Sequence, residues 1–209
     1  MQIAFIGYGE MGAQVHELLK QKYKTIKPVY FDDVLYKAKV KNAYPFNDYV
    51  KGAFKKHSFI ICLGYKHAAL KTKIYKQLLK LDRKNLSCTH ATCFVSRSAE
   101  IGAGSVLYPM CNIDKEVKIG HTVLLNNSVI VSHNTSIGNS CYLSPGVVLS
   151  GNVKIGDHSF LGSGVIVSNG VNIGKNVVAG IGTVITKDVP DNSHVIGNPM
   201  RFVDNLLIQ

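Results

Sequence analysis

His133 is the residue of this chain best suited to acid–base chemistry. It lies between two polar residues, Ser132 and Asn134, and an imidazole can take a proton from a nucleophile near neutral pH. Gly151 follows 18 residues later, and a residue without a side chain leaves its backbone N–H approachable. A base beside such an N–H suits acyl transfer to an amine. The alternatives are a hydrated surface histidine and a turn glycine without a ligand.

A six-residue period links these two residues. From Val95 to Ile185 every sixth residue is apolar, the fourth residue after each is small or β-branched, and the first is often a turn-forming glycine. This period predicts a parallel β-helix in which three hexads, 18 residues, form one coil. His133 is the second residue after the apolar Val131, off the core positions. The coil length then stacks Gly151 beside His133 at about 4.8 Å.

The N-terminal part of the chain has a different pattern. Short apolar runs alternate with amphipathic stretches over residues 2–90, as in βαβ units. We therefore expect an α/β, Rossmann-like domain over residues 1–90 and a β-helix domain over 91–209. Gly7, Gly9 and Gly12 follow the first strand, and Asp32 and Asp33 come about 20 residues further on, as in dinucleotide-binding sites. Such a turn also suits any other diphosphate.

Composition narrows the range of functions. The net charge is +11, and its excess lies in residues 1–90, with 17 basic against 6 acidic residues. These charges are dispersed over helix-like segments rather than gathered in a binding motif, so nucleic-acid binding is not supported. The five cysteines form no CxxC pair, and we expect small buried hydrophobes rather than disulfides or a metal site. Without a signal peptide or a membrane-spanning run, we expect a cytoplasmic protein with no membrane span.

Five segments resemble the NeuD/PglD-like sugar O- and N-acetyltransferases: GYGEMG at 7–12, FDD at 31–33, LLNNSVIVSHNTSIG at 124–138, LSPGVVLSGNVKIG at 143–156 and GNPMR at 197–201. The resemblance implies a left-handed β-helix with acetyl-CoA as co-substrate and no metal. It implies acetylation of the amino group of a dTDP- or UDP-linked 4-amino-4,6-dideoxy sugar, in lipopolysaccharide O-antigen biosynthesis. It also implies a homotrimer with active sites between subunits.

The same resemblance suggests roles for individual residues. It makes His133 the general base, oriented by Asn134, and makes the Gly151 N–H the donor to the thioester carbonyl. It places Asn126 and Tyr142 near the sugar. The residues expected to bind CoA are Gly151, Asn169, Gly197, Pro199 and Arg201. The residues expected to bind the nucleotide are Gly7, Gly9, Asp32, Asp33 and Gly64.

The chain also departs from the family pattern. Asn134 stands where many members have Asp or Glu, and Tyr142 where some have a second histidine. Glu10 and Met11 replace a common Gly-His pair, which leaves the identity of the sugar open. Three functions remain as alternatives: O-acetylation of sialic acid, a nicotinamide-dependent oxidoreductase using the N-terminal glycines, and a non-catalytic sugar-binding scaffold. His121, His158 and His194 are interpreted as surface residues.

Overall fold

The structure is a computed structural model that describes residues 1–204. The chain forms two compact units, Met1–Cys88 and Thr89–Gln209. This division falls two residues before the boundary expected from the sequence. In the described part of the chain, no helix has the length and apolar character needed to cross a membrane.

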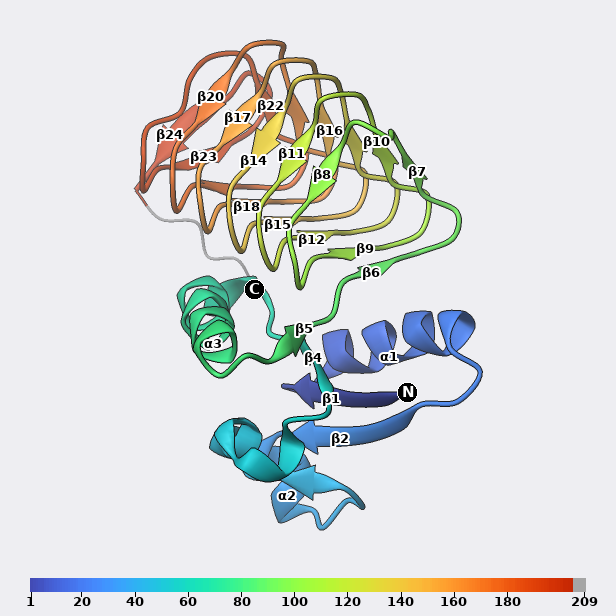
Figure 1. Ribbon diagram of the computed structural model, residues 1–209. Coiled ribbons are helices and arrows are strands. Elements are labelled where there is room, and N and C mark those ends of the chain that lie inside the picture. The colour runs from blue at the N-terminus through green and yellow to red at the C-terminus, as the bar shows by residue number, and fades with distance from the viewer. Residues whose placement is uncertain (205–209) are drawn as a thin grey trace. The chain divides into compact units, whose positions relative to one another are not determined.

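The first unit contains one five-stranded parallel sheet, sheet A, with the strand order β3-β2-β1-β4-β5 (Figure 1). This order matches the first five strand positions of the doubly wound order 3-2-1-4-5-6. Its strands are β1 Gln2–Ile6, β2 Lys27–Phe31, β3 Ala43–Tyr44, β4 Ser58–Ile61 and β5 Lys84–Asn85. Its helices are α1 Glu10–Lys22, α2 Asp33–Lys37 and α3 Ala68–Lys80, with the 3₁₀ turns η1 Phe46–Val50, η2 Gly52–Phe54 and η3 Tyr65–His67.

Apolar residues at helical and strand spacing build the core of this unit. All four residues from Ile3 to Ile6 are fully buried, as expected for a central parallel strand covered on both faces. α1 buries Val15 and Leu19, which lie one turn apart on the same face. α3 likewise buries Ile74 and Leu78. The βαβ pattern thus gives a sheet whose strand ends carry the candidate nucleotide residues.

The second unit is a β-helix whose coils are built from three parallel sheets, which we call B, C and D (Figure 1). Sheet C contains β7 Phe94–Val95, β10 Asn112–Ile113, β13 Ile130–Val131, β16 Val148–Leu149, β19 Ile166–Val167 and β22 Val184–Ile185. Sheet D contains β8 Glu100–Ile101, β11 Lys118–Ile119, β14 Ser136–Ile137, β17 Lys154–Ile155 and β20 Asn172–Ile173. Sheet B contains β6 Cys88–Thr89, β9 Val106–Leu107, β12 Leu124–Leu125, β15 Tyr142–Leu143, β18 Phe160–Leu161, β21 Val178–Ala179, β23 His194–Ile196 and the antiparallel β24 Arg201–Val203.

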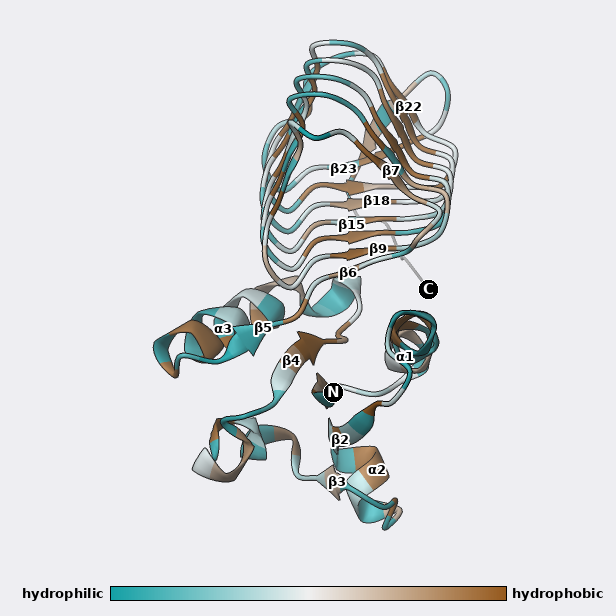
Figure 2. Ribbon diagram, turned by 45° about the vertical axis from the view of Figure 1, so that its right-hand side comes forward, coloured by the Kyte–Doolittle hydropathy of each residue, from teal (hydrophilic) through white to brown (hydrophobic). Residues whose placement is uncertain are grey.

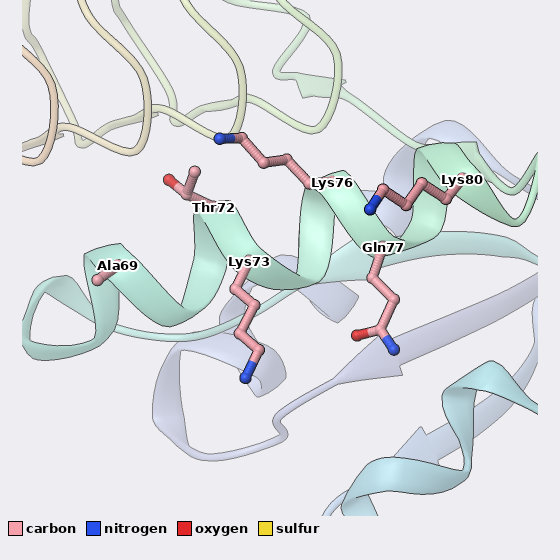
Figure 3. A pocket seen from close by; sticks show the side chains of 6 residues that line it. All are labelled: Ala69, Thr72, Lys73, Lys76, Gln77 and Lys80. Atoms are coloured by element: carbon pink, nitrogen blue, oxygen red, sulfur yellow. The ribbon is translucent and has the colours of Figure 1, made fainter.

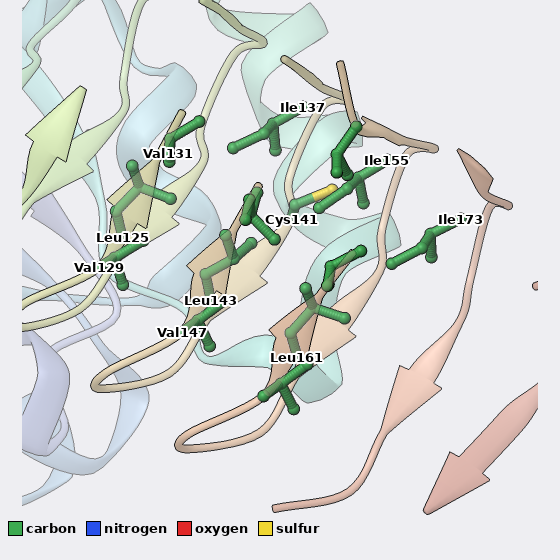
Figure 4. Close-up of a cluster of buried hydrophobic side chains, with 14 of the residues drawn as sticks. Leu125, Val129, Val131, Ile137, Cys141, Leu143, Val147, Ile155, Leu161 and Ile173 are labelled. Atoms are coloured by element: carbon green, nitrogen blue, oxygen red, sulfur yellow. The ribbon is translucent and has the colours of Figure 1, made fainter. Parts of the chain in front are cut away.

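The predicted hexad register sets the core of this unit. Strands pair with the strand 18 residues away, for example Val131 with Ile113 and with Leu149. Both inward positions of each hexad fill the interior (Figure 4), and hydrophobic strands recur at the same place in successive coils (Figure 2). These short parallel strands fit the left-handed β-helix that the resemblance implies. Four cysteines are buried as predicted, whereas Cys93 is partly exposed.

The corners of the coils differ from the turn predicted at the first residue after each apolar position. The left-handed backbone lies two residues later, as at Asn134, where φ is 58°. The glycines at the first position are needed for close approach instead. A Cβ on Gly156 would stand 2.6 Å from the backbone nitrogen of Lys175 on the next coil. Coils at strand spacing leave no room there for a side chain.

Candidate functional site

His133 stands at the corner where the chain leaves sheet C for sheet D. It follows β13 by two residues and is half-buried. Its Nδ1 lies 3.0 Å from Oδ1 of Asn134, and an amide oxygen can only accept a hydrogen bond. Nδ1 therefore carries the proton and donates to Asn134. This leaves the lone pair of neutral imidazole on Nε2, the form required of a base.

Gly151 occupies the matching corner of the next coil, directly against the His133 ring. A Cβ on Gly151 would stand 2.5 Å from Cε1 and 2.6 Å from Nε2 of His133. No real Cβ tolerates such contacts, so only glycine lets the imidazole lie there. Among residues 1–204 the Gly151 N–H has no hydrogen-bond acceptor. The site therefore combines a basic nitrogen and an unused donor on adjacent coils.

The same corner continues as a column of side chains along the β-helix. Steps of one coil lead from Lys115 to His133, Gly151, Asn169 and Lys187, as fixed by the pairing of β10, β13, β16, β19 and β22. Oδ1 of Asn169 would lie 2.9 Å from a Cβ on Gly151, so this predicted CoA residue adjoins the His133–Gly151 pair. The sequence analysis missed Lys115 and Lys187, although the same 18-residue step identifies both.

Asn126 and Tyr142 lie together, but not with His133. The Asn126 amide donates to the Tyr142 hydroxyl over 3.3 Å, and the Tyr142 ring lies 5.6 Å from that of Phe160 on sheet B. Asn126 follows β12 at the corner between sheets B and C, whereas His133 marks the corner between C and D. The two groups thus flank opposite edges of sheet C within one chain.

The last predicted CoA residues form the turn between β23 and β24. Gly197 has a φ of 96°, the Asn198–Pro199 peptide is cis, and Arg201 is exposed. Lys187 lies 5.9 Å from the ring centre of Phe202, the residue after Arg201. Lys187, the last residue of the column, therefore lies against β24, the strand that also carries Arg201.

The N-terminal glycines gather at the carboxyl edge of sheet A. Gly7 has a φ of 79°, and a Cβ there would meet the Leu63 side chain at 2.7 Å, so the turn after β1 lies against the end of β4. Gly9 caps α1 and Gly64 caps η3, and neither has an atom within 4 Å of the space for a Cβ. Exposed N–H groups at helix N-termini are a suitable environment for phosphate.

The two aspartates at this edge differ in their free oxygens. Asp32 accepts three backbone N–H groups: Oδ1 from Val34 and Leu35 at 3.0 and 3.1 Å, and Oδ2 from Tyr8 at 2.8 Å. Asp33 is exposed, and one of its oxygens accepts from Phe46 N at 2.9 Å. Asp32 thus caps α2 and ties it to the glycine turn, while Asp33 keeps an oxygen for a ligand.

A further pocket and three further histidines do not involve the predicted site residues. A pocket along α3 is lined by Ala69, Thr72, Lys73, Lys76, Gln77 and Lys80 (Figure 3); it contains none of the predicted site residues. His121 is exposed, and His158 and His194 are half-buried. No cluster of three His, Cys, Asp or Glu side chains that could hold a metal occurs among residues 1–204.

Known proteins match the chain at two levels. A family model described as the GMPPB C-terminal domain matches residues 107–205, and no curated protein matches the sequence. Among solved structures, the acetyltransferase domain of PglB from Neisseria gonorrhoeae FA1090, in complex with acetyl coenzyme A, is 28% identical. Its alignment covers 97% of this chain and 98% of that chain, with a TM-score of 0.86.

Two further structures are equally similar over nearly their whole length. PerB from Caulobacter crescentus, in complex with CoA and GDP-perosamine, is 25% identical, with coverage of 97% of both chains and a TM-score of 0.88. WeeI from Acinetobacter baumannii AYE is 26% identical, with coverage of 97% of this chain and 100% of that chain and a TM-score of 0.87.

The repeat fold, the His133–Gly151 pair and these similarities define the class: the chain is a sugar acetyltransferase built on hexapeptide repeats. Within that class, the three structures confirm the resemblance to the NeuD/PglD-like acetyltransferases that was predicted from the sequence.

Proposed function

We propose that the chain transfers an acetyl group from acetyl-CoA to the amino group of a nucleotide-linked 4-amino-4,6-dideoxy sugar. The donor is supported by the acetyl coenzyme A complex of the PglB domain. The acceptor class is supported by the GDP-perosamine complex of PerB. The observation that carries the proposal is the His133 imidazole lying against Gly151, whose N–H is unused within residues 1–204.

The reaction follows from these two groups. The sugar amine attacks the thioester carbonyl while Nε2 of His133 takes its proton. The Gly151 N–H donates to the oxyanion of the tetrahedral intermediate, which stabilises developing charge without moving. Collapse of the intermediate forms the amide, breaks the C–S bond and releases CoA thiolate. The thiolate then receives the proton held by His133.

The column of residues supplies a path for CoA along the β-helix. Asn169 follows Gly151, and Lys187 lies at the C-terminal end of the same column, against the strand that carries Arg201. A CoA molecule laid along this column has its phosphates near those cations. We assign the nucleotide of the acceptor to the carboxyl edge of sheet A, with Gly7, Gly9 and Gly64 at its phosphates and Asp33 at a hydroxyl or base.

We further propose that the enzyme is a homotrimer formed through sheet C. Three outward side chains of this sheet are apolar and exposed, namely Phe94, Ile130 and Ile166 at 60%, 42% and 45% exposure. The outward positions of sheet D are instead polar, as at Lys118 and Lys154. Exposed apolar surface of this kind favours association.

A threefold arrangement would also bring together the polar groups that lie apart within one chain. In a ring, one edge of a subunit contacts the opposite edge of its neighbour. Asn126 and His133 lie at opposite edges of sheet C. The arrangement therefore brings Asn126 and Tyr142 of one copy toward His133 of the next, where they contact the sugar.

The test is an acetyl-transfer assay that follows CoA release. Acceptors are UDP-, dTDP- and GDP-linked 4-amino-4,6-dideoxy sugars, with the matching 4-hydroxy sugars and sialic acid as controls. We expect turnover only with amino sugars, and a kcat reduced about 10²- to 10⁴-fold in His133→Ala. Turnover of sialic acid alone would replace the acceptor proposed here, and full activity of His133→Ala would contradict the role of the base.

A further inference from the structure

The His133–Asn134 pair lacks a negative charge. Asn134 Oδ1 orients the imidazole through Nδ1, but an amide cannot offset the charge that the ring gains when Nε2 takes the amine proton. A carboxylate partner in the same position would stabilise the imidazolium. An acidic group that acts through Asn134 would supply this charge.

Glu116 occupies the position equivalent to Asn134 on the preceding coil. Both residues have left-handed backbone, with φ of 56° and 58°. The Asn134 N–H donates to the carbonyl of Lys115, the residue before Glu116, over 3.1 Å. With β10 and β13 in register, the two Cα atoms are about one strand spacing apart, roughly 4.8 Å.

Side chains at such paired corner positions contact one another elsewhere in this β-helix. Thr122 and Ser140, with φ of 55° and 54°, are joined by a hydrogen bond of 2.7 Å between their hydroxyls. Asn176 and Asn192, with φ of 53° and 58°, are joined by one of 2.9 Å between their amides. The left-handed corner therefore directs successive side chains alongside each other, and Glu116 and Asn134 have the same backbone.

Both side chains also have the required groups free. Within residues 1–204, neither the Asn134 NH₂ group nor the Glu116 carboxylate has a hydrogen-bond or ion-pair partner. The residue beyond Asn134 in the same column, Asn152, donates instead to Asn169 over 3.3 Å. A carboxylate that can accept and an amide that can donate are thus both left without a partner at matching positions of adjacent coils.

We propose that Glu116 is a positioning residue for the acetyl-transfer reaction. Its carboxylate accepts from the Asn134 amide, holds Asn134 Oδ1 on the Nδ1–H of His133, and stabilises the imidazolium formed during catalysis. In this hydrogen-bonded series, Glu116–Asn134–His133, the carboxylate lies one coil away from the imidazole instead of bonding to it directly. This inference rests on the proposed function, because it assigns His133 the role of base.

Other charges at this corner come from the preceding coil. Asp114 and Lys115 face the same region, and Asp114 Oδ1 accepts from the Lys115 N–H over 2.7 Å, within its own turn. The following coil presents Ser150, Gly151 and Asn152, which carry no charge. Of the charged residues of the preceding coil at this corner, only Glu116 is in register with Asn134.

The test measures the protonation of His133 without substrate. The ¹³Cε1–H signal of His133, assigned by its loss in His133→Gln, is titrated by NMR in the full-length protein and in Glu116→Gln. Glu116 is exposed, so the isosteric change preserves the fold. We expect the pKa of His133 to fall by roughly 0.5–1 unit. Glu100→Gln is the control, because it alters another exposed carboxylate, on sheet D. It should leave the titration of His133 unchanged.

A double-mutant cycle separates the relay through Asn134 from a general charge effect. The titration is measured in the unaltered protein, in Glu116→Gln, in Asn134→Ala and in the variant that carries both changes. If Glu116 acts through Asn134, its effect on the titration shrinks once Asn134 is gone, and the acid limb of kcat/KM moves to lower pH in Glu116→Gln. Additive effects, or an unchanged titration in Glu116→Gln, overturn the proposal. The titration needs no sugar substrate. Its result can therefore be interpreted even if the acetyl-transfer assay fails.

Discussion

The imidazole of His133 lies in the space that a side chain on Gly151 would fill, with Nε2 2.6 Å from the ideal Cβ position. Gly151→Ala should therefore push the ring away from its working position. Because the obstructing atoms belong to a movable side chain, the fold should survive. We expect kcat to fall at least tenfold with little change in thermal stability, measured by steady-state kinetics and thermal unfolding.

Gly156→Ala is the matched control for that variant. Its Cβ would meet backbone atoms of the next coil, at 2.6 Å from Lys175 N and 2.7 Å from Gly174 C, and backbone cannot step aside as a side chain can. We expect a loss of stability instead, by about 1–3 kcal/mol. An unchanged kcat in Gly151→Ala would contradict the close approach of His133.

Association through sheet C should depend on its exposed apolar residues. Ile130→Asp places a charge in the proposed interface, where burial of the exposed part of the isoleucine contributes about 1 kcal/mol per copy. We expect sedimentation to show monomers at concentrations where the unaltered protein is trimeric, with loss of activity. Lys154→Asp on sheet D should remain trimeric. A monomeric unaltered protein would rule out a shared site.

Asp32 and Asp33 should respond differently to substitution. Asp32→Ala removes the cap of α2 and the partner of the Tyr8 N–H, and we expect a stability loss of about 1–2 kcal/mol. Asp33→Asn keeps an acceptor for the Phe46 N–H but removes the charge. We expect unchanged unfolding and a KM for the nucleotide sugar raised roughly tenfold. Equal effects of both variants on KM would contradict the distinction.

The N-terminal unit should lose stability in mild acid. Burial lowers the pKa of His16 and of His57 below the ordinary value of 6.5. Below that pH the unfolded chain binds protons that the folded chain does not, so stability falls as pH falls. His16→Gln keeps a partner for the Tyr8 hydroxyl, which lies 2.6 Å from His16 Nδ1. We expect its melting temperature to drop less between pH 7.5 and 5, as measured by thermal unfolding.

The control for this prediction is His121→Gln, at an exposed corner of the β-helix. It should follow the unaltered protein across the whole range. A melting curve of His16→Gln with the full acid dependence would mean that burial of this histidine has no part in the effect.

Cys93 should be the first thiol to react with iodoacetamide. A hydrogen bond from the Cys111 thiol lowers the pKa of Cys93 to about 7, and the other four cysteines are buried. The thiolate is the reactive form. Mass spectrometry at pH 7.5 should locate the first label on Cys93, with slower labelling in Cys111→Ala and not in Cys111→Ser, which keeps a donor. First labelling at Cys62 or Cys141 would contradict this.

The backbone relationships of the β-helix could be read from the sequence. Each strand is bonded to the strand one coil away, so an 18-residue step predicts neighbours as soon as the hexads are aligned. This placed Gly151 beside His133, and the same step would have identified Lys115 and Lys187. In a regular repeat, residues that contact one another are separated by a fixed number of residues, so the contacts can be predicted from the sequence. An irregular fold has no such fixed separation.

The choice of partner for each side chain was decided only in three dimensions. The sequence analysis gave Asp32 and Asp33 the same role, but the turn after β1 brings the Tyr8 N–H to Asp32, whose oxygens are already shared with the start of α2. Likewise the resemblance placed Asn126 and Tyr142 near the sugar, and only the structure shows that within one chain they lie at the edge of sheet C opposite His133. Periodicity fixes which backbones are adjacent, because the hydrogen bonds between coils repeat. Side-chain hydrogen bonds depend on the direction in which each corner points its side chain and on which acceptors compete for each donor. Both differ from one coil to the next.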